Sequence, residues 1–227
     1  MAVTLPSADE KAQVVDAMFD RIAPRYDLIN HVMTGGLDVL WRRRAVRELR
    51  LPRGAVVADL ACGTGEMCRE LGRAGYRTIG FDHSEGMLAR AHGPGEFVRA
   101  DILDLPLAAG SVDGATSGFA MRNVVDLGRC VAEMARVVRP GGRVAVVDLA
   151  EPRPVTRWIQ ATWMDRVVPR IGALLSDGDA YRYLPASNAY LPDGAALIAL
   201  FRDAGFPDTR RFLLGFGTVQ VVAGTRT

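Results

Sequence analysis

The sequence predicts an α/β protein in which helices cover both faces of a mostly parallel β-sheet. From residue 55 onward, short apolar runs alternate with segments whose apolar residues recur at helical spacing. This alternation is typical of strand–helix–strand units, which form parallel sheets. The chain ends in two β-rich runs, residues 209–214 and 218–224, joined by a Gly-Phe-Gly link. We expect these two runs to form an antiparallel pair at the edge of the sheet.

The composition fits a single globular domain that spans residues 1–227. Of the 227 residues, 49% are hydrophobic and 24% are charged, which is ordinary for a globular protein. The net charge of +2 is spread along the chain, whereas nucleic-acid binders gather basic residues on one face, so we expect no nucleic-acid partner. The three cysteines, Cys62, Cys68 and Cys130, show neither metal-ligand nor redox spacing. We therefore expect a protein of the reducing cytoplasm that holds no metal.

The first 50 residues are expected to be mostly helical. An apolar stripe at helical spacing ends at Pro24, and a polar-aromatic stretch, residues 25–36, leads to a second amphipathic helix. We expect Leu37 and Leu40 to share an apolar face of that helix. The four arginines between residues 42 and 47 are expected on a solvated face, and contact with an anionic membrane surface is the alternative.

Five apolar runs are expected as the strands of the core. They are residues 55–61, 78–82, 97–101, 111–120 and 143–150. Helical patterns accompany them. They cover residues 66–74, a start near residue 83, residues 127–138 and residues 193–206. Residues 151–192 interrupt this rhythm, and their apolar spacing predicts a helical insertion before the last helix.

The most informative motif follows the first predicted strand. Asp59 lies in that strand, and Gly63, Thr64 and Gly65 form a small-residue loop before the next helix. Small residues let a ligand approach the backbone, and the N-terminus of a helix offers N–H groups to an anion. A nicotinamide fingerprint needs a small residue three positions after its second glycine, where this chain has Cys68. The loop therefore favours a small carboxylate-bearing group over a dinucleotide pyrophosphate.

Acidic residues follow the next two predicted strands. Asp82 comes about 20 positions after Gly63, where a carboxylate binds a ribose diol in nucleotide folds, and a helix N-cap is its alternative role. Asp101 is placed to accept the exocyclic amine of an adenine between Ile102 and Met87, and a loop cap is its alternative role. Because the carboxyl ends of parallel strands share one sheet edge, we expect these groups to lie together.

These residues resemble the class I S-adenosylmethionine-dependent methyltransferases and, more particularly, the ubiquinone/menaquinone biosynthesis C-methyltransferase (UbiE-type) family. The resemblance covers about residues 15 to 224. Its specific segments are FDRIAPRYDLIN, LWRR, DLACGTG, FAMRNVVD, RVVRPGGR, VPRIGALL and DAYRYL. It implies a Rossmann-like, seven-stranded, mostly parallel sheet with a reversed final strand.

The resemblance also implies a cofactor and its binding residues. S-adenosylmethionine is the expected cofactor and S-adenosylhomocysteine its product. Implied contacts are Thr64, Asp82, Asp101, Ile102 and Ser117, and the motifs above add Asp59, Gly63, Gly65 and Met87. We expect four parts in the single domain. They are an N-terminal helical lid (1–50), a cofactor-binding core (51–150), a helical acceptor-pocket insertion (151–192) and a final helix with a strand pair (193–227).

The expected reaction is C-methylation of a quinol or hydroquinone-like acceptor of the demethylmenaquinol type. The chain departs from the family at residues 185–189, at residues 212–216, and at His31, where the family commonly has Asp. The two altered segments favour, as the alternative, C- or O-methylation of a small aromatic secondary metabolite. A nicotinamide oxidoreductase and a non-catalytic cofactor-binding module are the alternatives from other classes.

Four residues are candidates for catalysis. Loss of a phenolic proton makes the acceptor ring electron-rich, so a base or a hydrogen-bonding group should help. Arg122 is placed to stabilise a phenolate, with a structural salt bridge as the alternative, and Asn123 follows it at the sheet edge. His31 in the lid and Tyr181 beside the acceptor cavity complete the set, with packing as the alternative role for both. We expect an aromatic or quinol acceptor as the partner, together with a homodimer and a peripheral membrane contact.

Overall fold

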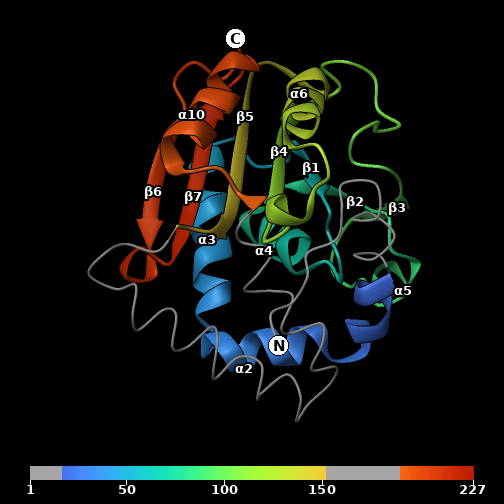
Figure 1. The fold of residues 1–227 in the computed structure, drawn as a ribbon. Helices are drawn as coiled ribbons and strands as arrows, with labels where there is room; N and C mark the ends of the chain where they lie inside the picture. The colour runs from blue at the N-terminus through green and yellow to red at the C-terminus, as the bar shows by residue number, and fades with distance from the viewer. Residues whose placement is uncertain (1–16, 152–189) are drawn as a thin grey trace.

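The computed structural model describes residues 17–151 and 190–227 (Figure 1). Its core is a seven-stranded sheet with the strand order β3-β2-β1-β4-β5-β7-β6. The strands are β1 (Val56–Leu60), β2 (Arg77–Asp82), β3 (Glu96–Arg99), β4 (Val112–Gly118), β5 (Val138–Leu149), β6 (Arg210–Leu214) and β7 (Val219–Thr225). β1 to β5 pair in parallel, and β7 runs antiparallel to both of its neighbours. The predicted mostly parallel sheet with a reversed final strand is confirmed.

The position of the last two strands refines the prediction. β6 and β7 form the expected antiparallel pair, but β7 lies between β5 and β6, so β6 is the edge strand of this pair. The sequence explains this order, because β7 is buried along nearly its whole length, whereas β6 is not fully buried at any position. A strand that is apolar on both faces belongs inside a sheet.

Helices cover both faces of the sheet, as predicted. Their bounds are α2 (Tyr26–Thr34), α3 (Leu37–Leu49), α4 (Glu66–Ala74), α5 (Glu85–Leu88), α6 (Leu127–Val137) and α10 (Gly194–Asp203), with short 3-10 turns η1 (Ala23–Arg25), η2 (Met121–Asn123) and η5 (Gly215–Gly217). α3 and α4 bury Leu49 and Leu71 in one core cluster, and α6 and α10 bury Met134 and Phe201 in another. α6 and α10 begin at Asp residues whose side chains cap the first turn.

The N-terminal segment is more helical than predicted. Residues 17–22 are helical, and the polar-aromatic stretch after Pro24 contains α2, which the sequence pattern does not indicate. Pro24 does not end the helical pattern as expected, because it lies in the first turn of η1, where a missing N–H group does not matter. α2 ends at Gly35, which adopts a left-handed conformation that glycine tolerates.

The prediction for α3 is wrong at particular positions. Leu37 and Leu40 are exposed, whereas Arg42 is buried. Arg42 is buried because its guanidinium pairs with the buried Asp38 carboxylate at 2.5 Å and lies over the ring of Phe119. A buried charge needs such a partner, and the hydrophobic pattern alone does not reveal it.

The predicted insertion, residues 151–192, lies almost entirely outside the described residues, and so does Tyr181. The four-part division of the domain stays a prediction. In the part of the chain that the structure describes, no helix combines the length and apolar character needed to span a bilayer.

Candidate functional site

A cavity of about 240 Å³ lies at the carboxyl edge of the sheet. Loops that follow β1, β2, β3 and β4 contribute to its wall, and the N-terminal helical segment covers it. Its lining residues are Phe19, Tyr26, Ala61, Gly63, Asp82, His83, Ser84, Met87, Asp101, Ile102, Leu103, Gly118, Phe119, Ala120, Asn123, Val124 and Val125. Open α/β sheets bind ligands at this edge, which makes the cavity the candidate site.

Asp82 is fixed in the cavity wall by two backbone donors. The N–H of Gly63 donates to Oδ2 at 2.7 Å, and the N–H of Ser84 donates to Oδ1 at 2.9 Å. Ser84, rather than Asp82, caps α5, because its hydroxyl accepts from the N–H of Met87. The carboxylate therefore joins the glycine loop to the second strand end and presents a fixed negative charge to the cavity.

The glycine loop turns only one of its three predicted residues toward the cavity. Gly63 lines it, whereas the Thr64 hydroxyl donates to Asp27 at 2.6 Å. Gly65 has a φ of +88°, and a Cβ built on it would lie 2.5 Å from the carbonyl oxygen of His92. Gly65 is therefore required by the close approach of the neighbouring loop, and α4 begins directly after it.

The three residues that the sequence predicts around an adenine lie together in the structure. Asp101, Ile102 and Met87 all line the cavity, although the first two follow β3 and Met87 lies in α5. Asp101 also has its alternative role, because Oδ1 accepts from the N–H of Leu103 at 2.9 Å. Met87 is buried and packs in the cluster formed by the N-terminal segment.

Asp59 and Ser117 lie beneath the loops, away from the cavity surface. Both are completely buried. Asp59 accepts a hydrogen bond from Thr116 at 2.9 Å, and burial raises the pKa of its carboxyl group to about 7. The hydroxyl of Ser117 has no hydrogen-bond partner within the described ranges. Side chains alternate between the faces of a strand, and the sequence does not show which position faces a ligand.

Arg122 and Asn123 occupy one turn but face different surroundings. Arg122 is buried, pairs with Asp148 at 2.5 Å and donates to the carbonyl of Phe119 at 2.6 Å. Arg122 thus has the salt bridge that the sequence left open, and it does not line the cavity. Asn123 does line it, and both polar atoms of its amide are buried without a partner among residues 17–151 and 190–227. A buried amide without partners is costly unless a ligand satisfies it.

Tyr26 faces Asn123's part of the cavity from α2. Its phenol is buried, and burial raises the pKa above its ordinary value, although the nearby Arg122 and Arg42 act in the opposite direction. Phe19 packs edge-on against the Tyr26 ring, with centroids 5.8 Å apart. Phe19 belongs to the apolar stripe and Tyr26 to the polar-aromatic stretch that the sequence shows on either side of Pro24.

His31 is not part of the site. It lies five residues after Tyr26 on α2, which turns it to a different side of the helix. Its exposed ring lies 3.3 Å from the Asp38 carboxylate. The prediction of a catalytic role for His31 is therefore not supported by its position, since it does not line the cavity.

Two backbone outliers also line the cavity. Ala61 and Phe119 have φ values of +53° and +61°, which non-glycine residues rarely adopt. Such strain is concentrated at ligand sites in proteins. Neither residue type signals a left-handed conformation, so no pattern in the sequence points to these two positions.

Acidic side chains attach the N-terminal segment to the loops. Asp20 accepts hydrogen bonds from the hydroxyl of Ser84 and the N–H of Gly86, and Asp27 accepts one from Thr64. These bonds hold the segment over the cavity at two separate strand ends. This arrangement is what a lid requires.

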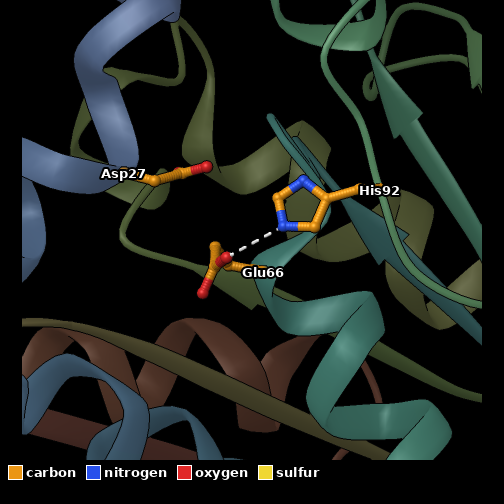
Figure 2. Close-up of side chains that lie close together, drawn as sticks. All are labelled: Asp27, Glu66 and His92. Atoms are coloured by element: carbon orange, nitrogen blue, oxygen red, sulfur yellow. Dashed lines mark ion pairs between the residues drawn. The ribbon is translucent and has the colours of Figure 1, made fainter.

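Figure 2 shows Asp27, Glu66 and His92 close together beside the glycine loop. His92 lies 3.3 Å from Glu66, but Arg69 already pairs with both Glu66 oxygens at 2.6 Å and lies 3.2 Å from the His92 ring. A guanidinium therefore occupies the position between Glu66 and His92 that a metal ion would need. We interpret the group as an ion-pair network behind the loop.

Comparison with known families decides the class of this site. The model of the ubiE/COQ5 methyltransferase family matches residues 7–226, nearly the whole chain. The chain belongs to this family. It is therefore a methyltransferase, and the resemblance expected from FAMRNVVD and the neighbouring segments is confirmed.

Relatives of this methyltransferase are similar over almost their full length. It is 37% identical to the ubiquinone/menaquinone biosynthesis C-methyltransferase of Syntrophotalea carbinolica, over 92% of this chain and 93% of the relative. It is 37% identical to the demethylmenaquinone methyltransferase of Corynebacterium kroppenstedtii, over 96% of both chains. The corresponding enzyme of Thermus thermophilus is 38% identical, over 92% of this chain and all of the relative.

Solved structures support the fold of the methyltransferase. A SAM-dependent methyltransferase from Thermotoga maritima matches with a TM-score of 0.67 at 21% identity, over 93% of this chain and 99% of that one. A phosphoethanolamine N-methyltransferase from Haemonchus contortus, solved with S-adenosyl-L-methionine, matches with a TM-score of 0.59 at 13% identity. The second match covers 81% of this chain and 52% of that one.

Proposed function

We propose that this chain is an S-adenosylmethionine-dependent C-methyltransferase whose acceptor is a quinol of the demethylmenaquinol type. The printed names of the relatives support the acceptor class. The observation that carries the proposal is one cavity lined both by a fixed carboxylate, Asp82 at the end of β2, and by an unpartnered amide, Asn123 after β4, with β1 between these two strands. The Asp82 end suits the nucleoside, and the Asn123 end suits the acceptor.

The residues of the first end fit the cofactor. Asp82 would accept hydrogen bonds from the ribose hydroxyls, and charge-assisted bonds of this kind are strong. Asp101 would accept the adenine amine, with Ile102 and Met87 against the faces of the ring. Gly63 leaves space for the nucleoside to approach the backbone, since no atom lies within 4 Å of the point that a Cβ would occupy there. Bound there, the cofactor supplies a methyl group on positively charged sulfur.

The residues of the second end fit a phenolic acceptor. Bound S-adenosylmethionine would supply the methyl group to a ring carbon as its sulfur–methyl bond breaks and S-adenosylhomocysteine leaves, and that ring carbon would then release its proton to water to restore the aromatic ring. Negative charge on the phenolic oxygen drives this attack. Because burial raises the pKa of Tyr26, its phenol stays protonated near neutral pH and donates a hydrogen bond to that oxygen.

Asn123 and Arg122 complete the acceptor end. The amide of Asn123 gains the partners it lacks when it binds the acceptor. Arg122, paired with Asp148, acts from behind the Phe119 backbone as a fixed charge rather than as a contact group. No general base is assigned among these residues. Apolar lining residues such as Phe119 and Val124 would displace water around a bound acceptor, which would help a nucleophilic carbon compete for the methyl group.

Two altered segments favour the alternative acceptor, a small aromatic metabolite, and the structure removes the support of one of them. In the altered segment at residues 212–216, the first three residues lie in β6 and the last two in the turn to β7, and none of them lines the cavity. The other altered segment, residues 185–189, lies outside the described residues. No described contact therefore favours the alternative acceptor.

Methyl transfer from isotopically labelled cofactor tests the proposal. The purified protein should label a short-chain demethylmenaquinol analogue on carbon, and S-adenosylhomocysteine should accumulate in equal amount. Label on oxygen, or on small phenols only, would contradict the quinol proposal. Tight binding of NAD in place of S-adenosylmethionine would contradict the methyl-transfer reaction itself.

Three further properties belong to this proposal. A cytoplasmic location and a homodimer stay predictions. A peripheral membrane contact follows from an acceptor with an apolar tail, and the surface that would make this contact is identified next.

A further inference from the structure

Exposed apolar side chains gather at one end of the molecule. They are Leu28 and Val32 on α2, Leu37 and Leu40 on α3, and Leu213 and Phe216 at the β6–β7 turn. Phe216 is the extreme case, because 91% of its surface is exposed. We call these six residues the apolar end. An exposed cluster of large apolar residues marks an interaction site more often than scattered ones do.

The three segments of the apolar end lie close together. Figure 1 shows α2, the first turns of α3 and the β6–β7 turn at the same end of the fold. A Cβ built on Gly215 would lie 3.1 Å from the ring of Trp41 on α3. The turn that carries Phe216 therefore packs against the helix that carries Leu40, so their apolar groups form one surface.

Positive charge borders this surface without exposed negative charge on the same helix. Arg47 on α3 is exposed, and so is Arg43, which also pairs with Glu70 of α4 at 2.8 Å, whereas the two acidic residues of α3, Asp38 and Glu48, are buried in ion pairs. Positions three and four apart on a helix share one face, so Leu40, Arg43 and Arg47 follow one another along α3. Side chains lean toward the N-terminus of a helix, which brings both guanidinium groups toward the leucines.

The backbone at Phe216 adds an independent observation. Its φ is +57°, in the left-handed region that glycine adopts readily and phenylalanine rarely does. Neighbouring Gly215 and Gly217 also have positive φ values. The turn is therefore held in a strained form that projects an aromatic ring into solvent, and such strain is retained mainly where function requires it.

We propose that the apolar end docks on an anionic lipid membrane. Apolar side chains at the tip enter the acyl region, and arginines above them contact lipid phosphates, the pattern of interfacial membrane proteins. α2 also carries Tyr26, which lines the cavity, so one helix separates the membrane surface from the acceptor end of the site. The delivery of an acceptor from the bilayer to the cavity rests on the proposed function, whereas the docking itself does not.

Vesicle sedimentation tests the apolar contacts. The full chain should bind vesicles of phosphatidylcholine with about one third phosphatidylglycerol. Phe216→Gly and Leu40→Asn should each weaken binding by about tenfold or more, because each removes a large apolar group from the contact. Phe216→Gly should not lower the melting temperature, because glycine accepts the backbone conformation without strain.

Matched arginine variants test the electrostatic part. Arg47→Gln should weaken binding to anionic vesicles about fivefold, while Arg210→Gln, an exposed arginine at the start of β6, should leave binding unchanged. Added salt should weaken binding of the unaltered protein. Equal effects of the two arginine variants would overturn the assigned surface.

The remaining outcomes distinguish a failure of the docking proposal from a failure of the proposed function. Failure of the unaltered protein to bind anionic vesicles overturns the docking proposal, even if the protein methylates a soluble short-chain quinol. Binding lost in Phe216→Gly, with full activity on that soluble quinol, supports it. A dimer that Phe216→Gly converts to a monomer would assign the surface to a second copy of the chain and overturn the membrane proposal. Vesicle binding without methyl transfer to any quinol would overturn only the proposed function.

Discussion

The two ends of the cavity differ in whether their polar groups already have hydrogen-bond partners. At the cofactor end, backbone N–H groups of Gly63 and Ser84 already orient the carboxylate of Asp82. At the acceptor end, the amide of Asn123 is buried with no partner in the described segments. In the proposed function, one end is complete before its ligand arrives, and the polar atoms of the other gain partners only when its ligand binds. The difference predicts that substitutions at the first end damage binding and fold together, whereas substitutions at the second damage catalysis alone.

Gly65→Ala should have the largest effect. The new methyl group would meet the carbonyl oxygen of His92 at 2.5 Å in a backbone conformation that disfavours alanine. We expect a loss of unfolding free energy on the order of 3 kcal/mol and loss of cofactor binding. Gly63→Ala is the matched control, because its φ is also positive but no atom lies within 4 Å, so about 1–2 kcal/mol should be lost. Equal melting temperatures for the two variants would contradict the steric role of Gly65.

Asp59→Asn should change how stability depends on pH. Burial raises the pKa of the folded Asp59 carboxyl group to about 7, above its unfolded value, so the folded state holds the proton more tightly. This group therefore makes the unaltered protein less stable as pH rises from about 4 to 7, by about 1.4 kcal/mol per unit. Denaturant unfolding from pH 5 to 8 should show the variant gaining stability relative to the unaltered protein. Parallel curves for the two proteins would refute the raised pKa.

Asp82→Asn tests the cofactor end directly. It keeps the size of the side chain but removes the charge that we propose binds the ribose, and we expect binding to weaken by about 1.5–3 kcal/mol. Calorimetric titration with S-adenosylhomocysteine measures the change. Asp104→Asn is the control, because Asp104 is exposed on the neighbouring loop and does not line the cavity. An Asp82 variant that binds S-adenosylhomocysteine as tightly as the control would contradict the assignment of Asp82 to the ribose.

Asn123→Leu should have the smallest effect on stability, and this effect should be an increase. Replacing an unpartnered buried amide by an apolar group of similar shape should raise the unfolding free energy by about 1 kcal/mol. Methyl transfer should fall at least tenfold, while cofactor affinity stays within twofold.

Ser117→Ala provides the comparison for Asn123→Leu. It removes another unpartnered buried polar group, but from a position that does not line the cavity. It should raise stability without loss of methyl transfer. Loss of cofactor affinity in this variant would instead support the contact that the family resemblance implied.

The cofactor end was largely predictable from the sequence. Gly63, Asp82 and Asp101 follow successive strands, and parallel strands bring their carboxyl ends to one edge regardless of details. Chain order and strand direction were enough to bring these residues together. The orientation of Asp59 and Thr64 was not predictable, because it depends on which face of the strand or loop each side chain occupies.

The positions of side chains on α2 and α3 were less predictable because they depend on tertiary partners. Arg42 is buried because its guanidinium pairs with the Asp38 carboxylate and lies over the Phe119 ring. His31 points away from the cavity because α2 is a helix. The sequence pattern left α2 undetected, since its apolar residues are divided between the core and the exposed apolar end. Hydrophobic periodicity does not reveal a helix whose apolar residues are partly exposed.

A crystal structure with bound S-adenosylhomocysteine tests the central claim most directly. We predict ribose hydroxyls within hydrogen-bond distance of Asp82, adenine between Ile102 and Met87, and the sulfur directed toward Asn123. Density for the nucleoside at the Asn123 end, or outside this cavity, would contradict it.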